Sequence, residues 1–211
     1  MSRDLLAREF LADGVVHALG LALGGGGALA LVILAVVEGS EVAPISIYAA
    51  GLVGMLGCSA AYHLLRTYRR RALLRRFDHA AIFAMIAGSY TPFTTLGLDG
   101  AWSVTLTIVV WSVAALGIAI KLWQPHRVET ISVVLYLALG WMGIVALDPL
   151  LHALPTATLV LIGSGGILYS AGVVFHLWRA LPYHNAIWHG FVLVAALLHY
   201  FAVLTVIPPL A

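Results

Sequence analysis

Residues 104–120 read VTLTIVVWSVAALGIAI, a stretch without a single Asp, Glu, Lys or Arg. An α-helix needs about 20 mostly apolar residues to cross the roughly 30 Å hydrocarbon layer of a bilayer, and this stretch with its neighbours reaches that length. A spanning β-strand would alternate apolar residues with polar residues that face a lumen, and the stretch lacks that pattern. We therefore predict a membrane-spanning helix at this point in the chain.

The whole chain has a similar composition, because 62% of its 211 residues are apolar and only 9% are charged. Soluble proteins carry about 25% charged residues, so we expect lipid rather than water to cover most of the surface. The single cysteine, Cys58, excludes an internal disulfide and a zinc module built from four cysteines.

Seven stretches between the charged or proline-containing segments are long enough to cross a bilayer. We predict an all-α, polytopic membrane protein with a single seven-transmembrane-helix domain at residues 14–207. The expected spans are 15–37, 43–65, 79–97, 101–120, 130–147, 157–178 and 186–206. Residues 1–13 carry mixed charge and several apolar side chains, so we expect them to form a cytoplasmic interfacial segment.

The basic residues indicate how these helices are oriented. If the seven spans alternate in direction, all eleven Lys and Arg residues fall on the side of the N-terminus. The loops of the other side carry only the acids Glu38, Glu41, Asp99 and Asp148. The positive-inside rule then places the N-terminus in the cytoplasm and the C-terminus outside.

Several of the nine histidines lie near the predicted cytoplasmic helix ends. Ser59 and His63 are four residues apart, as are Asn185 and His189, so each pair occupies one face of its helix. Imidazoles from two helices, with the Asp78 carboxylate at the same depth, form the kind of ligand set that zinc prefers. Zinc in such a site would activate water at neutral pH, and Asp78 could orient that water or act as its general base.

The same residues also have structural interpretations that the sequence leaves open. Buried His, Ser and Asn side chains often form hydrogen bonds between membrane helices without any metal. Asp78 could be a helix N-cap neutralised by Arg75 and Arg76. Gly20 and Gly24 have the GxxxG spacing, which permits close helix packing without requiring a dimer.

Membrane lipids are the expected partners, and no nucleic-acid partner is expected. A run of arginines in the second connection is explained as a topology signal, with contact to anionic lipid headgroups as the alternative. The arginines concerned are Arg66, Arg69, Arg70, Arg71, Arg75 and Arg76.

Three motifs together resemble those of a known family. They are SAAYH at Ser59–His63, RRFDHAAIFAMIAGSYTPF at Arg75–Phe93 and NAIWHGFVLVAALLHYFAVL at Asn185–Leu204. In this order on seven spans they are similar to the hemolysin III group of the progestin and adipoQ receptor family. That family is grouped with the alkaline ceramidases in a wider set of proposed membrane hydrolases. The similarity extends over nearly the whole chain.

The resemblance implies a Zn²⁺ ion in the inner-leaflet half of the bundle. It assigns His63 and His189 as metal ligands, Asp78 as the carboxylate that contacts the metal water, and Ser59 as its neighbour.

The chain departs from the family pattern at one position. The family motif on the last helix is H-x3-H, and Asn185 stands where its first histidine is expected. The adjacent His184, His17 on the first span, or a water molecule are the alternatives for completing the ligand shell. His184 is about 100° of helix rotation away from the face of His189. His17 follows Asp13 by four residues, where the family tends to show a polar residue followed by histidine, and is expected to neighbour the site.

The resemblance favours a zinc-dependent hydrolase that cleaves an amide or ester of a lipid entering from the inner leaflet of a bacterial cell membrane. Ser59 is then expected to help stabilise the oxyanion. The alternative is a non-enzymatic protein that senses or adjusts the state of the membrane. Pore formation, which the family name suggests, does not fit an integral membrane protein of this composition.

Overall fold

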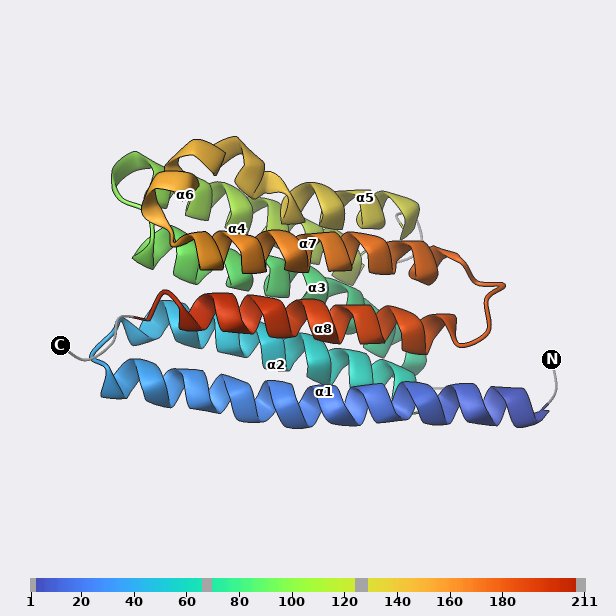
Figure 1. The fold of residues 1–211 in the computed structure, drawn as a ribbon. Coiled ribbons are helices and arrows are strands. Elements are labelled where there is room, and N and C mark those ends of the chain that lie inside the picture. Colours follow the sequence, from blue (N-terminus) through green and yellow to red (C-terminus); the bar gives the residue numbers. More distant parts are fainter. Residues whose placement is uncertain (1–2, 66–69, 124–128, 208–211) are drawn as a thin grey trace.

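The computed structural model describes residues 3–65, 70–123 and 129–207, and every regular element in these ranges is a helix. Figure 1 shows the long helices aligned side by side in one bundle. In chain order the elements are α1 (Arg3–Val37), α2 (Val42–Leu64), α3 (Arg71–Leu96), α4 (Gly100–Trp123), α5 (Glu129–Gly140), the 3₁₀ helix η2 (Met142–Ala146), α6 (Leu147–Ala153), α7 (Thr156–Leu177) and α8 (His184–Leu204). Over these residues the predicted all-α fold is confirmed.

Most neighbouring helices along the chain pack against each other, because short connections leave them little choice of partner. α1 packs on α2, α2 on α3, α3 on α4 and α7 on α8, and α8 returns to pack on α1. α1 begins at one end of the bundle and α8 ends at the opposite end (Figure 1). The return of α8 to α1 brings together segments that are far apart in the sequence, and this contact positions the candidate site.

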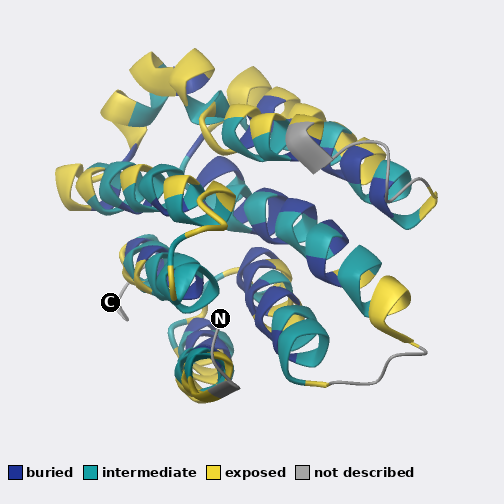
Figure 2. Ribbon diagram, turned by 90° about the vertical axis from the view of Figure 1, so that its right-hand side faces the viewer, coloured by how far each residue is buried: buried dark blue, intermediate teal, exposed yellow. Residues whose placement is uncertain are grey.

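Six segments are long and apolar enough to cross a membrane: Asp4–Val37, Val42–Leu64, Gly100–Trp123, Ile131–Ala153, Thr156–Leu177 and His184–Leu204. Large apolar side chains on these segments point outward, and Leu29, Leu116 and Ile167 are 61–63% exposed. Figure 2 shows exposed stretches along the outer faces of the bundle. Such extended apolar surface is unsuited to water, so the chain is an integral membrane protein whose helices contact lipid.

α3 is not among the six segments, and its place inside the bundle explains why. It packs against α2, α4, α5 and α8, and its buried residues include Phe83, Thr91 and Thr94. The Thr91 hydroxyl donates to the Ala87 carbonyl at 2.9 Å and accepts from Trp111 Nε1 at 3.0 Å. Because protein surrounds α3, its polar side chains find partners and the helix needs a less apolar sequence than its neighbours.

Two buried apolar cores hold the helices together, one around Tyr48 and one around Phe83. A glycine is required where α4 crosses the second core. A Cβ atom added at Gly117 would lie 2.5 Å from the ring of Phe83, so α4 can approach α3 this closely only without a side chain there.

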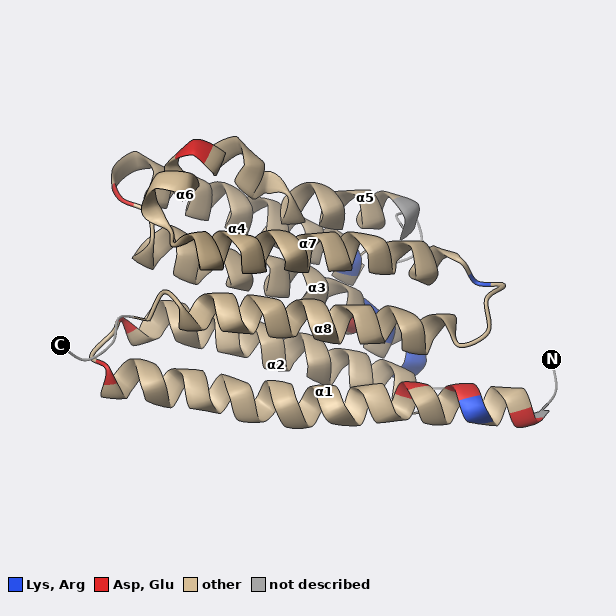
Figure 3. Cartoon of the chain, viewed as in Figure 1, with Lys and Arg blue, Asp and Glu red and all other residues tan. Residues whose placement is uncertain are grey.

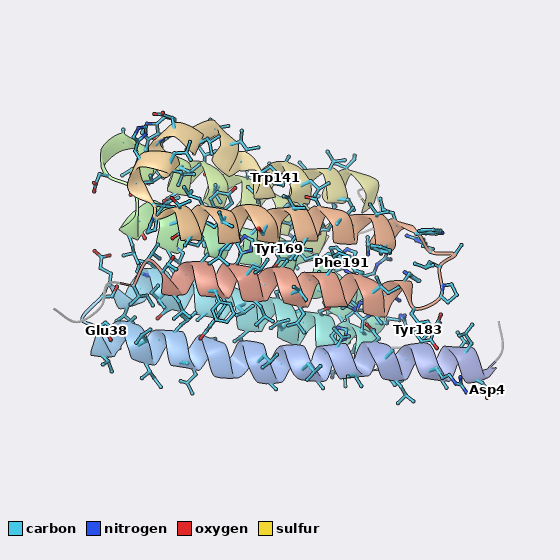
Figure 4. All side chains as sticks on the ribbon, viewed as in Figure 1. Asp4, Glu38, Trp141, Tyr169, Tyr183 and Phe191 are labelled. Carbon is cyan, nitrogen blue, oxygen red and sulfur yellow. The ribbon has the colours of Figure 1, made fainter. Side chains whose placement is uncertain are left out.

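The fifth expected span, 130–147, is interrupted rather than continuous. α5 ends at Gly140, and η2 and α6 follow it. The Tyr90 hydroxyl donates to the Gly140 carbonyl and accepts from the backbone N–H of Gly143, both at 2.8 Å, and so satisfies groups that the break releases. Trp141, labelled in Figure 4, donates from Nε1 to the Ser170 hydroxyl at 3.0 Å. The break falls at glycines, each of which costs a helix about 1 kcal/mol relative to alanine.

α1 is a single helix of 35 residues. The sequence predicts an interfacial segment at residues 1–13. From residue 3 onward these residues form the first part of α1, which continues through Gly14 without a break. At 1.5 Å per residue α1 is about 52 Å long, well beyond the roughly 30 Å that the hydrocarbon layer requires.

Charged residues are segregated between the two ends of the bundle. Figure 3 shows the Lys and Arg positions in the half where α1 begins, whereas the charged positions drawn at the opposite end are all acidic. These acids are Glu38 and Glu41 between α1 and α2, Asp99 before α4 and Asp148 in α6. The described residues therefore have the charge asymmetry on which the positive-inside prediction depends.

Candidate metal centre

Six polar side chains from four helices gather in the half of the bundle where α1 begins. They are Asp13 and His17 of α1, Ser59 and His63 of α2, Asp78 of α3 and His189 of α8. The members of the α1 pair are four residues apart, as are those of the α2 pair, so each pair faces one side of its helix. The two carboxylates and two of the three histidines are buried. Buried ionisable groups in a membrane protein are costly and mark functional sites.

The Asp13 carboxylate lies at the centre of this group. Its Oδ1 forms a 2.6 Å hydrogen bond with Nδ1 of His189, and its Oδ2 lies 3.5 Å from Nδ1 of His63. Each of Asp13, His63 and His189 offers one ligand atom, and these three atoms lie within 4.8 Å of one another. Imidazole nitrogen and carboxylate oxygen are common ligands of divalent metal ions, so the triad is a candidate metal site.

The three histidine rings of the cluster pack together. The ring centroids of His63 and His189 are 4.5 Å apart, and those of His17 and His189 are 4.4 Å apart. The ligands come from α1, α2 and α8, which are adjacent in the bundle but distant in the sequence. The site therefore forms only when α8 returns to α1.

His17 lies beside the triad but both of its ring nitrogens already have partners. Its Nδ1 donates to the backbone carbonyl of Asp13 at 2.8 Å, and its Nε2 lies 3.3 Å from the Ser59 hydroxyl. With Nδ1 protonated, the neutral ring accepts at Nε2, so the Ser59 hydroxyl is the donor of the second contact. His17 therefore lies beside the triad and is not part of the group that can hold a metal.

Asp78 lies inside α3 and is not its N-cap, contrary to the alternative considered from the sequence. α3 begins at Arg71 after the N-cap residue Arg70, so Asp78 is past the first turn of the helix. Its buried carboxylate lies beside the Ser59 hydroxyl and within electrostatic reach of His63. α3 therefore brings a second carboxylate to the edge of the triad.

A cavity of about 420 Å³ opens next to the triad. Asp13 and His63 line it, together with residues from the start of α1, the start of α3 and the start of α8. Glu9 of α1 accepts the backbone N–H of Tyr183 at 2.9 Å. Tyr183 has φ 61°, a left-handed conformation that is unusual for a residue with a side chain, and Figure 4 shows it at the turn that enters α8. Glu9 thus fixes this turn at the wall of the cavity.

Asn185, which stands at the position of the missing histidine, and His184, one of the alternatives for completing the ligand shell, both line this cavity. His184 is not part of the group that can hold a metal, and its buried Nδ1 has no hydrogen-bond partner among the residues that the structure describes. The third member of that group is Asp13 instead. Sequence reasoning named Asp13 only as the residue four positions before His17 and did not include it among the ligands.

The described histidines outside the cluster have other surroundings. His199 donates from Nδ1 to the Ala195 carbonyl of its own helix at 3.0 Å. His176 packs on Trp188, with ring centroids 5.2 Å apart. His79 and His152 are likewise outside the triad, and His126 lies outside the described residues.

Of the arginines considered for lipid contact, Arg66 and Arg69 lie outside the described residues. Arg71 stands over the ring of Tyr62, 5.5 Å from its centroid, and lines the cavity. Arg76 donates from Nη1 to the Leu122 carbonyl at 3.1 Å, which ties α3 to α4. These two side chains therefore have roles within the protein, and contact with anionic headgroups stays a prediction.

Comparison with known proteins identifies relatives over almost the full length. A family model described as "Haemolysin-III related" matches residues 8–200. A protein named "Hemolysin-3 homolog" from Bacillus subtilis (strain 168) is 35% identical over 199 residues, which are 93% of this chain and 93% of the relative. "Hemolysin-3" of Bacillus cereus is 34% identical over 206 residues, 97% of this chain and 94% of the relative. A more distant relative is "Heptahelical transmembrane protein ADIPOR2" of Oryza sativa subsp. japonica, 30% identical over 186 residues, 76% of this chain and 80% of the relative.

Proposed function

The chain belongs to the haemolysin III-related family, within the progestin and adipoQ receptor family, and on this premise we propose that it is a zinc-dependent hydrolase of a membrane lipid. The bond cleaved is an amide or an ester, and the lipid enters from the inner leaflet. The observation that carries the proposal is the convergence of Asp13, His63 and His189 from three helices.

The chemistry of these ligands supports zinc. Two imidazoles and one carboxylate, with a fourth position open, are a ligand set of catalytic zinc sites. Tetrahedral bonds of about 2.0–2.2 Å hold ligand atoms about 3.3–3.6 Å apart, and the 3.5 Å between His63 Nδ1 and Asp13 Oδ2 lies in that range. A metal bound by His189 Nδ1 and Asp13 Oδ1 would replace the 2.6 Å hydrogen bond between these atoms and displace its proton.

When bound, zinc supplies a Lewis acid that polarises the carbonyl of the substrate and activates water at neutral pH. In our proposal Asp78 accepts the proton of the attacking water and later delivers it to the leaving group. The Ser59 hydroxyl has one proton, which it donates to His17 Nε2 over 3.3 Å. In our proposal this hydroxyl turns from His17 to donate its proton to the oxyanion. The cavity beside Asp13 and His63 admits water and the polar part of the lipid.

We further infer that the chain crosses the inner membrane of a bacterial cell seven times, with α3 as the additional crossing. The N-terminus then lies in the cytoplasm and the C-terminus outside. The segregation of basic residues to the end where α1 begins supports this orientation. A reporter enzyme that is active only on the outer side of the membrane should be active when it is fused after α8 and inactive when it is fused before α1.

The first experiment is the metal content of the detergent-purified protein, by elemental analysis after metal-replete purification. The proposal expects about one zinc per chain in the wild type and close to none in Asp13→Ala, His63→Ala and His189→Ala. His152→Ala is the matched control, because His152 is exposed and lies outside the triad. It should keep the wild-type zinc content.

The second experiment measures the release of fatty acid from a lipid amide and a lipid ester in vesicles. Asp78→Asn should retain zinc and lose hydrolysis by about 10²–10⁴-fold, because it removes the proton acceptor. A wild type that binds zinc but releases no fatty acid would contradict the hydrolase. A wild type without zinc or activity would leave a non-enzymatic role in the state of the membrane.

A further inference from the structure

A second cavity, also of about 420 Å³, lies along the seam between α1 and α8. It is lined mainly by apolar residues, among them Leu23, Gly26 and Ala30 of α1 and Leu193, Leu197 and Phe201 of α8. Both helices are candidate membrane spans, and Leu23 and Phe201 are about half exposed, at 50% and 51%. The groove therefore opens toward the hydrocarbon of the bilayer.

The groove continues the face of α8 that carries the metal ligand. His189, Leu193, Leu197 and Tyr200 follow one another at steps of four, four and three residues, which place them on one side of the helix. Leu193, where the groove begins, is one helical turn or about 6 Å from His189. A chain lying in the groove would thus point its end at the metal site.

On α1 the metal site and the groove are separated by a buried position without a side chain. Gly20 lies between His17 and the groove-lining part of α1. A Cβ atom added there would lie 3.3 Å from Leu56 and 3.8 Å from Leu193, so these two flexible side chains pack against Gly20 at the end of the groove nearest to the metal site.

The polar cavity and the apolar groove lie on opposite sides of the triad along the same helices. Asp13 lines the polar cavity, together with residues 6–10 of α1 and 184–186 of α8. The groove is lined by residues between 22 and 30 of α1, Gly25 excepted, and by residues between 193 and 201 of α8, together with Leu52 and Leu56 of α2. Along the seam the order is polar cavity, metal ligands and apolar groove. This is the order of headgroup, scissile carbonyl and acyl chain in a lipid amide or ester.

Glycines in this part of α1 could instead indicate a seam with a second copy of the chain. Gly24 and Gly27, however, are already used within the chain. A Cβ atom at Gly24 would collide with Leu56, and one at Gly27 would lie 2.9 Å from the ring of Tyr200. Gly26 faces open space in the groove. The groove therefore remains open after the helices have packed. Because the groove faces the bilayer, a lipid chain is the molecule that can fill it.

We propose that the groove between α1 and α8 binds one acyl chain of the lipid substrate and so holds its amide or ester carbonyl at Asp13, His63 and His189. The inference rests on the proposed function and adds to it the substrate class: a lipid with a single long chain next to the bond that is cleaved. A second chain, where the lipid has one, stays in the bilayer.

The test is photolabelling of the purified protein in nanodiscs with a long-chain fatty acid that carries a diazirine near its methyl end. Adducts are expected in residues 22–30 and 193–201. Gly26→Phe fills the groove, and labelling of these peptides should fall at least about tenfold, because several methylene contacts are lost. Ala30→Phe, one turn along α1, is a second blocking variant.

Gly25→Phe is the matched control. A Cβ atom at Gly25 also meets open space, but Gly25 does not line the groove, so labelling should stay at the wild-type level. Equal labelling of the Gly25→Phe and Gly26→Phe proteins would overturn the proposal, as would adducts confined to other helices. A change from dimer to monomer in the Gly26→Phe protein, measured by light scattering, would assign the groove to a second copy and overturn it too.

Zinc content measured on the same samples separates this inference from the proposed function. Zinc-containing protein that is not labelled in the groove overturns the acyl-chain site and leaves the hydrolase. Groove labelling that Gly26→Phe abolishes, in protein that binds no zinc, supports the acyl-chain site and overturns the zinc hydrolase.

Discussion

The chain contains two Asp-x3-His motifs with almost the same local geometry, Asp13–His17 in α1 and Asp148–His152 in α6. In each, the histidine Nδ1 donates to the backbone carbonyl of the aspartate, at 2.8 and 2.9 Å. The carboxylate lies 3.6 and 3.7 Å from the same nitrogen. Their surroundings differ: the side chains of Asp13 and His17 are 9% and 4% exposed, whereas those of Asp148 and His152 are 89% and 79% exposed.

The comparison shows that the motif alone does not make a site. Asp13 meets His189 and His63 from two other helices, and His17 meets Ser59. In α6 both the carboxylate and the ring of the Asp148–His152 pair are largely exposed. A largely exposed contact of this kind contributes little, typically 0–1 kcal/mol. Helix packing, rather than local spacing, turns one of two similar motifs into a candidate metal centre.

The largest effect should come from neutralising the aspartate of each motif. We expect Asp13→Asn to weaken zinc binding by more than about 100-fold. Loss of a residue that only hydrogen-bonds to a metal ligand typically weakens binding by about 10–100-fold, and Asp13→Asn removes a ligand itself. Asp148→Asn should leave affinity unchanged. Competition with a chromophoric chelator measures both, and equal affinities of the two variants would remove the distinction drawn here.

Ser59→Ala tests whether the buried motif acts through its neighbours. The change removes the hydroxyl that lies between His17 and Asp78. Zinc content should stay near the wild-type value while hydrolysis falls by about 10–100-fold. Loss of zinc to the same extent as in His63→Ala would show instead that Ser59 supports the metal ligands.

Asn185→His restores the histidine that the family pattern expects. Asn185 lies one turn before His189 and lines the cavity with Asp13, so an imidazole there adds a nitrogen ligand on the same side of α8. We expect zinc affinity to rise about tenfold in the Asp13→Asn background, a gain of roughly 1.4 kcal/mol. Asn185→Ala in that background is the control and should show no gain.

The smallest effect concerns stability. His17→Ala removes a buried ring with partners at both nitrogens, and we expect a loss of about 1–3 kcal/mol. The melting temperature in detergent should fall by about 2–10 °C, judged from proteins of similar length. His152→Ala, at an exposed site, should stay within about 0.5 kcal/mol of the wild type. Similar shifts for the two variants would mean that burial does not separate the motifs.

The sequence predicted the helical membrane fold well because the signal is local. Long uncharged stretches need no knowledge of their neighbours to be identified as spans. The interruption at Gly140 was not foreseen, since it depends on Tyr90 of another helix satisfying the released backbone groups. The true start of α3 was missed as well, because the arginines before Asp78 suggested a connection rather than a helix.

The site could be predicted only in part for the same reason. His63 and His189 stood out through their spacing and the family motif, and the structure brings them together. Asp13 was overlooked as a ligand because it lies at the end of the charged N-terminal stretch and was assigned to an interfacial segment. One signal was available: Asp13 and His17 are four residues apart, like Ser59 and His63 on the facing helix.

The length of α1 has a mechanical consequence. α1 has 35 residues, and about 20 Å of its length exceeds what the hydrocarbon layer covers. If that excess stands in the cytoplasm, it is the outer arm of a lever whose inner part carries Asp13. Glu9 in this arm accepts the backbone N–H of Tyr183 at 2.9 Å, so a displacement of the arm would be passed to the start of α8, and the helices that carry Asp13 and His189 are coupled at this end.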